Sequence, residues 1–223
     1  MNRKNTRIKA IILGVVIGIF MVVVENVFNI PRDVMRKAYF ILGAVAIVGS
    51  VAINILWQKN FQKKVQALMP ILYEENNPDL FIEENKKLLE NIRSPYNKAF
   101  LLLNISVGYS DKRDYQKAKE ILLQIPENAI RGLNGIIYYI DLVYYNFKLM
   151  NMDEVISIMD KHEKEFKAFE NHKTIGKHIK LNQIFYLKAK NELEEADKLI
   201  SILEKESTDK RLLGDLEELK KGQ

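Results

Sequence analysis

The nonapeptide DYQKAKEIL at residues 114–122 has two counterparts further along this chain of 223 residues. They read NMDEVISIM at residues 151–159 and ELEEADKLI at residues 192–200. Each begins with a polar residue that can cap a helix, continues with a large apolar residue, and has a small or β-branched residue three positions later. The next large apolar residues follow three and four positions on, which keeps one helix face apolar. The three stretches therefore predict amphipathic helices of one kind.

A further apolar helical pattern precedes each of these stretches, at residues 99–109, 135–149 and 179–189. Upstream, Asn77-Pro78-Asp79 and Ser94-Pro95 have the order of cap and proline that starts a helix. No stretch of useful length alternates apolar and polar residues with the period of a strand. Residues 77–223 are therefore expected to form an all-α domain of stacked helical hairpins that share one core, capped by the charged segment 208–221.

This helix-turn-helix pattern resembles the tetratricopeptide repeat (TPR). In that family a small residue in the second helix lets the first helix pack closely, and an aromatic residue often stands nine positions before it, as Tyr109 does before Ala118. The small or β-branched positions Ala118, Val155 and Ala196 are 37 and 41 residues apart, whereas the family repeats every ~34 residues. The tryptophan and the leucine-glycine pair of the family's first helix are replaced by Leu102, Ile105 and Ser106. The resemblance covers about residues 96–206 and implies a bacterial membrane-anchored protein with a TPR-like α-α solenoid.

Two apolar runs in the first quarter of the chain predict membrane-spanning helices. Residues 10–24 are apolar without interruption, and an extension to residue 28 gives a helix of ~28 Å, close to the ~30 Å of a bilayer core. Residues 38–57 contain no charge and end in Trp57 at the expected interface. We expect a basic tail (1–9), a first span (10–28), a short loop turned by Pro31 (29–37), a second span (38–57) and a connector (58–76).

The first run could alternatively be a cleavable signal peptide, because basic residues precede it. No small-x-small cleavage site follows, however, and the second run begins only about ten residues later. The two runs are therefore interpreted as a transmembrane hairpin.

Basic residues are distributed unevenly around the hairpin. The loop carries Arg32, Arg36 and Lys37, whereas the flanks on the side of the termini carry Arg3, Lys4, Arg7, Lys9, Lys59, Lys63 and Lys64. The positive-inside rule then predicts a multi-pass protein of the cell membrane with both termini in the cytoplasm.

Small residues stand four positions apart in both runs: Gly14 and Gly18 in the first, Ala46 and Ser50 in the second. Such pairs let helix backbones approach closely in lipid. Packing of one span on the other is favoured because the two are tethered, and homo-oligomerisation through the same residues is the alternative.

Composition and spacing exclude several functions. Residues 1–64 hold ten basic and two acidic side chains, which leaves 24 basic and 27 acidic ones in the rest of the chain, so the folded part has no cationic face for nucleic acid. The chain has no cysteine. Its three histidines lack the spacing of a zinc site, and no phosphate loop or nucleophile motif is present. We expect no catalytic residues, no metal, no cofactor and no enzymatic activity.

The resemblance to TPR proteins implies that the first helix of each pair lines a concave groove for a peptide. The family's spacing assigns this surface to Phe100, Leu103, Val107, Ile137, Ile140, Tyr144, Phe147, Lys148, His178, Leu181, Phe185 and Lys188. Lys148 and Lys188 at its edge would suit a peptide with hydrophobic anchors and an acidic group or carboxylate. The alternative is that these residues are simply core.

The sequence thus favours a membrane-anchored adaptor or scaffold for protein-protein interaction at the cytoplasmic face, with the lipid bilayer and a protein or peptide as its partners. The alternative is an accessory or assembly subunit of a larger membrane complex, in which the hairpin makes the specific contacts. A transporter or channel component is a weaker possibility, because Glu25 is the one charge near the membrane interior.

Overall fold

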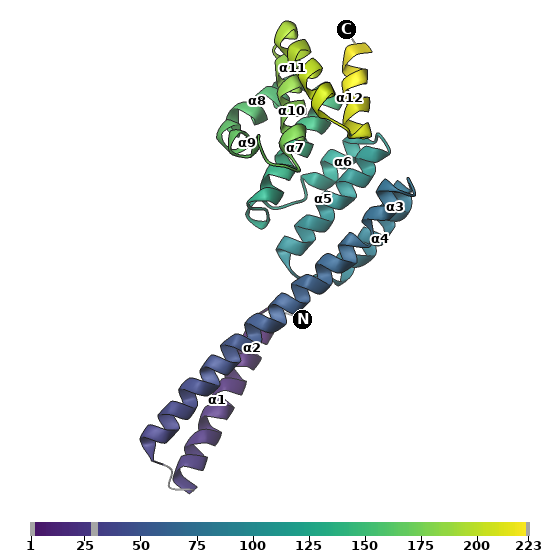
Figure 1. Cartoon of the computed structure of the whole chain (residues 1–223). Coiled ribbons are helices and arrows are strands. Elements are labelled where there is room, and N and C mark those ends of the chain that lie inside the picture. Colours follow the sequence, from purple (N-terminus) through teal and green to yellow (C-terminus); the bar gives the residue numbers. More distant parts are fainter. Residues whose placement is uncertain (1–2, 28–30, 222–223) are drawn as a thin grey trace. The chain divides into compact units, whose positions relative to one another are not determined.

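The computed structural model describes residues 3–27 and 31–221 of the chain. All regular secondary structure in these two ranges is helical, which confirms the predicted all-α class. The chain divides into two compact units, Met1–Lys64 and Val65–Gln223, and each is described by itself (Figure 1).

The N-terminal unit consists of α1 (Arg3–Val27) and α2 (Arg32–Gln66). Among the described residues, α2 is the helix long and apolar enough to cross a membrane, and its apolar part is not buried against protein. The predicted second span lies within it. The described apolar part of α1 is shorter, Val16–Val27, and the predicted loop residues 28–30 lie outside the described ranges.

Helix α2 extends beyond the predicted second span, residues 38–57, at both ends, and the boundaries of the span itself stay a prediction. Helix α2 already begins at Arg32, because the Pro31 carbonyl accepts hydrogen bonds from the backbone N–H groups of Val34 and Met35 at 3.0 and 3.1 Å. Proline has the backbone angle of a first helical turn, so Pro31 favours the start of this helix. The helix also continues beyond Trp57 to Gln66, since no proline or glycine interrupts residues 50–66.

The C-terminal unit contains one short helix followed by antiparallel pairs. Its helices are α3 (Met69–Tyr73), α4 (Pro78–Asn91), α5 (Pro95–Asp111), α6 (Tyr115–Leu122), the 3₁₀ turn η1 (Glu127–Ala129), α7 (Leu133–Lys148), α8 (Met152–Lys161), α9 (Glu163–Phe169), α10 (Gly176–Ala189), α11 (Leu193–Glu206) and α12 (Lys210–Lys221). Helices α4 to α8 pack in chain order, and α10 packs on α7, α8 and α11 (Figure 1).

The predicted helix starts are confirmed, and caps form at three of them, whereas Asn151 and Glu192 precede α8 and α11 without a side-chain cap hydrogen bond. The side chains of Asn77, Ser94 and Asp114 accept hydrogen bonds from backbone N–H groups three residues later, at 3.1, 3.4 and 3.0 Å. Pro78 and Pro95 occupy the first helical positions. Each cap satisfies a donor that the helix itself leaves without a partner.

The same turn joins the two helices of each pair. Arg113, Met150 and Asn191 have φ angles of 60°, 60° and 62°, and each stands directly before the N-cap residue of the second helix. The N–H group of the next residue donates to the carbonyl five residues earlier, at 3.0, 2.9 and 2.8 Å. This is the geometry of a Schellman turn, in which one left-handed residue ends a helix. The three pairs therefore share a backbone geometry as well as a sequence pattern.

Small residues permit the close packing of neighbouring helices. Ala118, Val155 and Ala196 are each 0% exposed. At Gly108 in α5, an added Cβ atom would come within 2.6 Å of the Ile82 side chain in α4, so only glycine allows this approach. The surrounding apolar side chains form two buried clusters, one centred on α5 to α7 and the other on α7 to α12.

The turn geometry generates a stability prediction at Met150, whose side chain is 74% exposed. A left-handed backbone is unfavourable for methionine, so Met150→Gly is expected to raise the free energy of unfolding by about 0.5–1 kcal/mol. Asn191→Gly should gain less, because asparagine already tolerates this conformation. Ser157→Gly, in the exposed helical backbone of α8, should instead lower stability by about 0.5 kcal/mol. Chemical denaturation of the three variants checks this order, and a loss of stability in Met150→Gly would contradict it.

Candidate functional site

The first helices of the three pairs, α5, α7 and α10, line a cavity of about 570 Å³ together with α12. Six of the residues predicted for the groove lie on its wall: Val107, Ile137, Ile140, Tyr144, His178 and Leu181. They come from three separate helices, so the fold brings together side chains that the sequence places far apart.

The other predicted groove residues have different surroundings. Leu103 and Phe185 are 4% and 0% exposed and belong to the two core clusters, because neighbouring helices cover them. Phe147 stacks on Phe185 with ring centroids 4.2 Å apart. Phe100 is partly buried and does not line the cavity, whereas Lys148 and Lys188 contact α12. Of the twelve residues that the family's spacing selects, six thus line the cavity, and the others lie in or near the core or contact α12.

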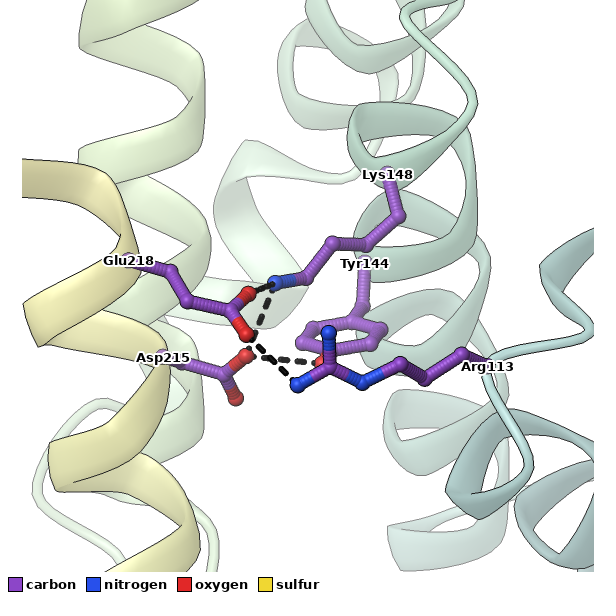
Figure 2. A network of polar contacts seen from close by, with 5 residues as sticks. All are labelled: Arg113, Tyr144, Lys148, Asp215 and Glu218. Atoms are coloured by element: carbon purple, nitrogen blue, oxygen red, sulfur yellow. Dashed lines mark hydrogen bonds and ion pairs between the residues drawn. The ribbon is translucent and has the colours of Figure 1, made fainter. Parts of the chain in front are cut away.

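Helix α12 lies along this face and is bound to it by a polar network (Figure 2). The Lys148 Nζ atom lies 2.9 Å from an Asp215 carboxylate oxygen and 2.8 Å from one of Glu218. The Tyr144 hydroxyl donates to Asp215 at 2.8 Å, and Arg113 donates to Glu218 at 2.8 Å. The groove edge that was predicted to bind an acidic peptide thus binds acidic side chains of the chain's own last helix.

The electrostatics of the network follow from its partial burial. Burial by itself lowers the pKa of Lys148, but the carboxylates of Glu218 and Asp215 outweigh it and raise that pKa above its ordinary value. The hydrogen bond from Lys148 lowers the pKa of Glu218. Burial, together with the Asp215 charge, raises the pKa of Tyr144, which stays a neutral hydrogen-bond donor. Lys148, Glu218 and Tyr144 therefore have protonation states that favour the docked α12.

This network predicts that Lys148 holds α12 in place. Lys148 and Asp215 are only 11% and 17% exposed, so Lys148→Ala leaves a shielded carboxylate without its cation and should cost on the order of 1–2 kcal/mol. Backbone hydrogen exchange is expected to accelerate in residues 210–221 while α5 and α6 stay protected. Lys117→Ala, which removes an exposed pair within α6, is the matched control and should change neither region. Equal exchange of residues 210–221 in wild type and Lys148→Ala would rule out this role.

Asp141 is a cavity residue that the sequence reasoning missed. Its Oδ2 atom is buried without a hydrogen-bond partner, although the residue as a whole is only partly buried. Burial raises the pKa of Asp141 to about 7. A signal was available in the sequence, because Asp141 is the one acidic residue within the 16 residues of α7. A lone carboxylate in an apolar helix needs either a partner or a function.

A second carboxylate on the cavity wall has a cation. Asp111, at the end of α5, lies 2.8 Å from the Arg211 guanidinium of α12. The same guanidinium lies over the Tyr73 ring, 4.7 Å from its centroid, and donates to the Leu72 carbonyl at 3.2 Å. The cavity therefore already contains one site in which a carboxylate, an aromatic face and a carbonyl bind a guanidinium.

Within residues 3–27 and 31–221 no group of three histidine, aspartate or glutamate side chains is placed to hold a metal ion. His162 stacks on Tyr139 with centroids 3.6 Å apart. Burial lowers the pKa of His178, which faces the cavity as a neutral ring at neutral pH.

The small residues predicted for transmembrane packing lie on open surface where the structure describes them. A Cβ atom added at Gly14 or Gly18 would meet no heavy atom within 4 Å. Ala46 and Ser50 are exposed, and the Ser50 hydroxyl donates to the Ile47 carbonyl of its own helix at 2.7 Å. These positions are therefore accessible to another helix.

Comparison with protein families, curated proteins and solved structures finds no match to this chain.

Proposed function

We propose that this protein is a membrane-anchored adaptor whose helical domain recruits a protein or peptide partner at the cytoplasmic face. In this proposal α1 and α2 form a two-span hairpin with both termini in the cytoplasm, and the C-terminal unit is a TPR-like solenoid. An anchored domain raises the effective concentration of a partner near the bilayer, so a binding site of modest affinity is sufficient.

Two features support the parts of this proposal. Helix α2 has the length and apolar surface of a membrane span, and the excess of basic residues on the side of the termini favours their cytoplasmic location. The three helix pairs share the turn at residues 113, 150 and 191 and the buried position at residues 118, 155 and 196. A turn and a buried position that recur in every helix pair are typical of a repeat array, in which each pair packs on its neighbours.

The observation that carries the recruiting role is the cavity between α5, α7, α10 and α12. Its volume of about 570 Å³ lies in the range of ~300–1,000 Å³ that is usual for ligand sites. Aliphatic side chains, tyrosines and many charged side chains converge on it from separate helices, so it offers apolar contact together with polar groups that can orient a partner.

A photo-crosslinking amino acid placed in the full chain tests this role. At His178, on the cavity wall, it is expected to form an adduct with a partner protein in native membranes, and Val107→Glu on the opposite wall should reduce that adduct at least tenfold. The same probe at Ser157, on the exposed face of α8, is the control and should give no such adduct. Adducts that are equal at both sites, or that are unaffected by Val107→Glu, would contradict recruitment through the cavity.

The second candidate is an accessory or assembly subunit that makes its specific contacts through the hairpin. The open surroundings of Gly14 and Gly18 favour it, because a small-residue stripe without a neighbour allows another helix to approach.

Replacement of residues 8–57 by an unrelated two-span hairpin separates the two candidates. An adaptor is expected to keep the His178 adduct at an unchanged yield, because the hairpin provides location only. A subunit of a larger complex should lose its partner while the protein stays in the membrane fraction. The measurement is the adduct yield per membrane-inserted chain.

A further inference from the structure

We propose that the cavity between α5, α7, α10 and α12 is a binding site for a guanidinium or primary ammonium group on an apolar stem, with Asp141 as its counter-ion. The proposal concerns the cavity assigned to partner recruitment and rests on that function in one respect: a basic side chain of a partner segment supplies the cation. The direct test uses small cations, so its outcome is independent of the crosslinking experiment.

The charges on the cavity wall are not balanced. Asp111 has Arg211 as its partner, and Asp215 and Glu218 share Lys148. Asp141 has no such cation, and its buried Oδ2 atom accepts no hydrogen bond. A carboxylate that is shielded from water is unfavourable unless a cation or a donor compensates it. Lys210 also lines the cavity, but no ion pair among the described residues joins it to Asp141, so this carboxylate has unused capacity for one cationic hydrogen-bond donor.

The chain's own Arg211 shows which cation the cavity accepts. Its guanidinium combines an ion pair with Asp111, contact with the Tyr73 ring and a hydrogen bond to the Leu72 carbonyl. Asp141 lies on the same cavity wall as Tyr73 and Tyr145, and its charge acts on both phenols. An aromatic face beside a carboxylate is a favourable environment for a guanidinium or an alkylammonium ion.

The remaining lining suits an apolar stem. Ile137, Ile140 and Leu181 come from two helices and face the cavity beside Asp141. Inorganic cations are less suitable, because no third carboxylate or histidine among the described residues joins to complete a metal site. The ligand that fits both the charge and the lining is therefore an organic cation with several methylene groups.

The pH dependence follows from the groups that face Asp141. The other titratable and charged residues that line the cavity are Tyr73 from α3, Asp111 from α5, Arg113 before α6, Tyr115 from α6, Tyr144 and Tyr145 from α7, His178 from α10 and, from α12, Asp209, Lys210, Arg211, Asp215 and Glu218. Burial raises the pKa of the Tyr73 and Tyr145 phenols and lowers the pKa of His178, so both phenols are neutral from pH 6 to pH 8 and His178 is neutral at pH 8. The pKa of Asp141 is about 7, and its carboxylate is ionised above that value. Affinity for a permanent cation should therefore rise about tenfold from pH 6 to pH 8.

The test is a titration of the full chain in detergent micelles with 1-butylguanidine and its neutral isostere butylurea, followed by ligand-observed nuclear magnetic resonance. Wild type at pH 8 is expected to bind butylguanidine at least tenfold more tightly than butylurea, and about tenfold more tightly than at pH 6. Asp141→Asn should remove both differences. Asp153→Asn, an exposed carboxylate of α8, is the matched control and should behave as wild type.

The folding of the variant is checked separately. An amide at residue 141 has no charge to desolvate, so Asp141→Asn is expected to unfold at a higher temperature than wild type at pH 8. The reason is that a carboxyl group with a raised pKa in the folded state loses stability as the pH rises through that pKa. Circular dichroism measures both helix content and the unfolding temperature.

The source of the cation is tested with N-acetyl-Leu-Arg-Leu-amide and its citrulline analogue. Tighter binding of the arginine peptide than of butylguanidine, with loss of binding by the citrulline peptide, supports a basic side chain of a partner segment. Weaker binding of the arginine peptide would overturn that source. Equal binding of butylguanidine to wild type and Asp141→Asn, or no binding to either, would overturn the cation site itself.

Discussion

The close approach of helices at Ala118, Val155 and Ala196 is the constraint on which the C-terminal unit depends. Each of these side chains has no exposed surface, because the first helix of its pair lies directly over it. A single pair of this kind cannot bury its apolar face alone, so the pairs must stack. Stacking brings α5, α7 and α10 to one side, and the cavity exists because those three helices line it together.

The elements that the sequence predicts well are those with a local physical cause. The helix starts at Asn77, Ser94 and Asp114 depend on a side chain that caps its own helix, and the apolar faces depend on helical periodicity. Both causes operate within a few residues. Helix α2 starts at Arg32, before the predicted second span at residue 38, because the Pro31 carbonyl accepts hydrogen bonds from Val34 and Met35.

The parts that the sequence does not reveal depend on contacts between distant residues. The docking of α12 depends on Lys148 meeting Asp215 and Glu218, which are about 70 positions further along the chain. The separation of groove from core at Leu103 and Phe185 depends on which neighbouring helix covers each of them. The lone charge of Asp141 in α7 is visible in the sequence, but the absence of a hydrogen-bond partner for its buried oxygen is known only from the fold.

Arg113 has two structural roles, and each role favours a different residue type. As the left-handed residue of the turn between α5 and α6 it occupies a position where glycine is preferred, whereas its guanidinium also binds Glu218 of α12. Glycine at position 113 would remove the strain of the left-handed backbone, but it would also remove the contact with Glu218. Arginine keeps that contact and the strain. The turn of the first helix pair and the C-terminal helix are thus linked through one residue, so a glycine that favours the turn would also remove a contact between this turn and α12.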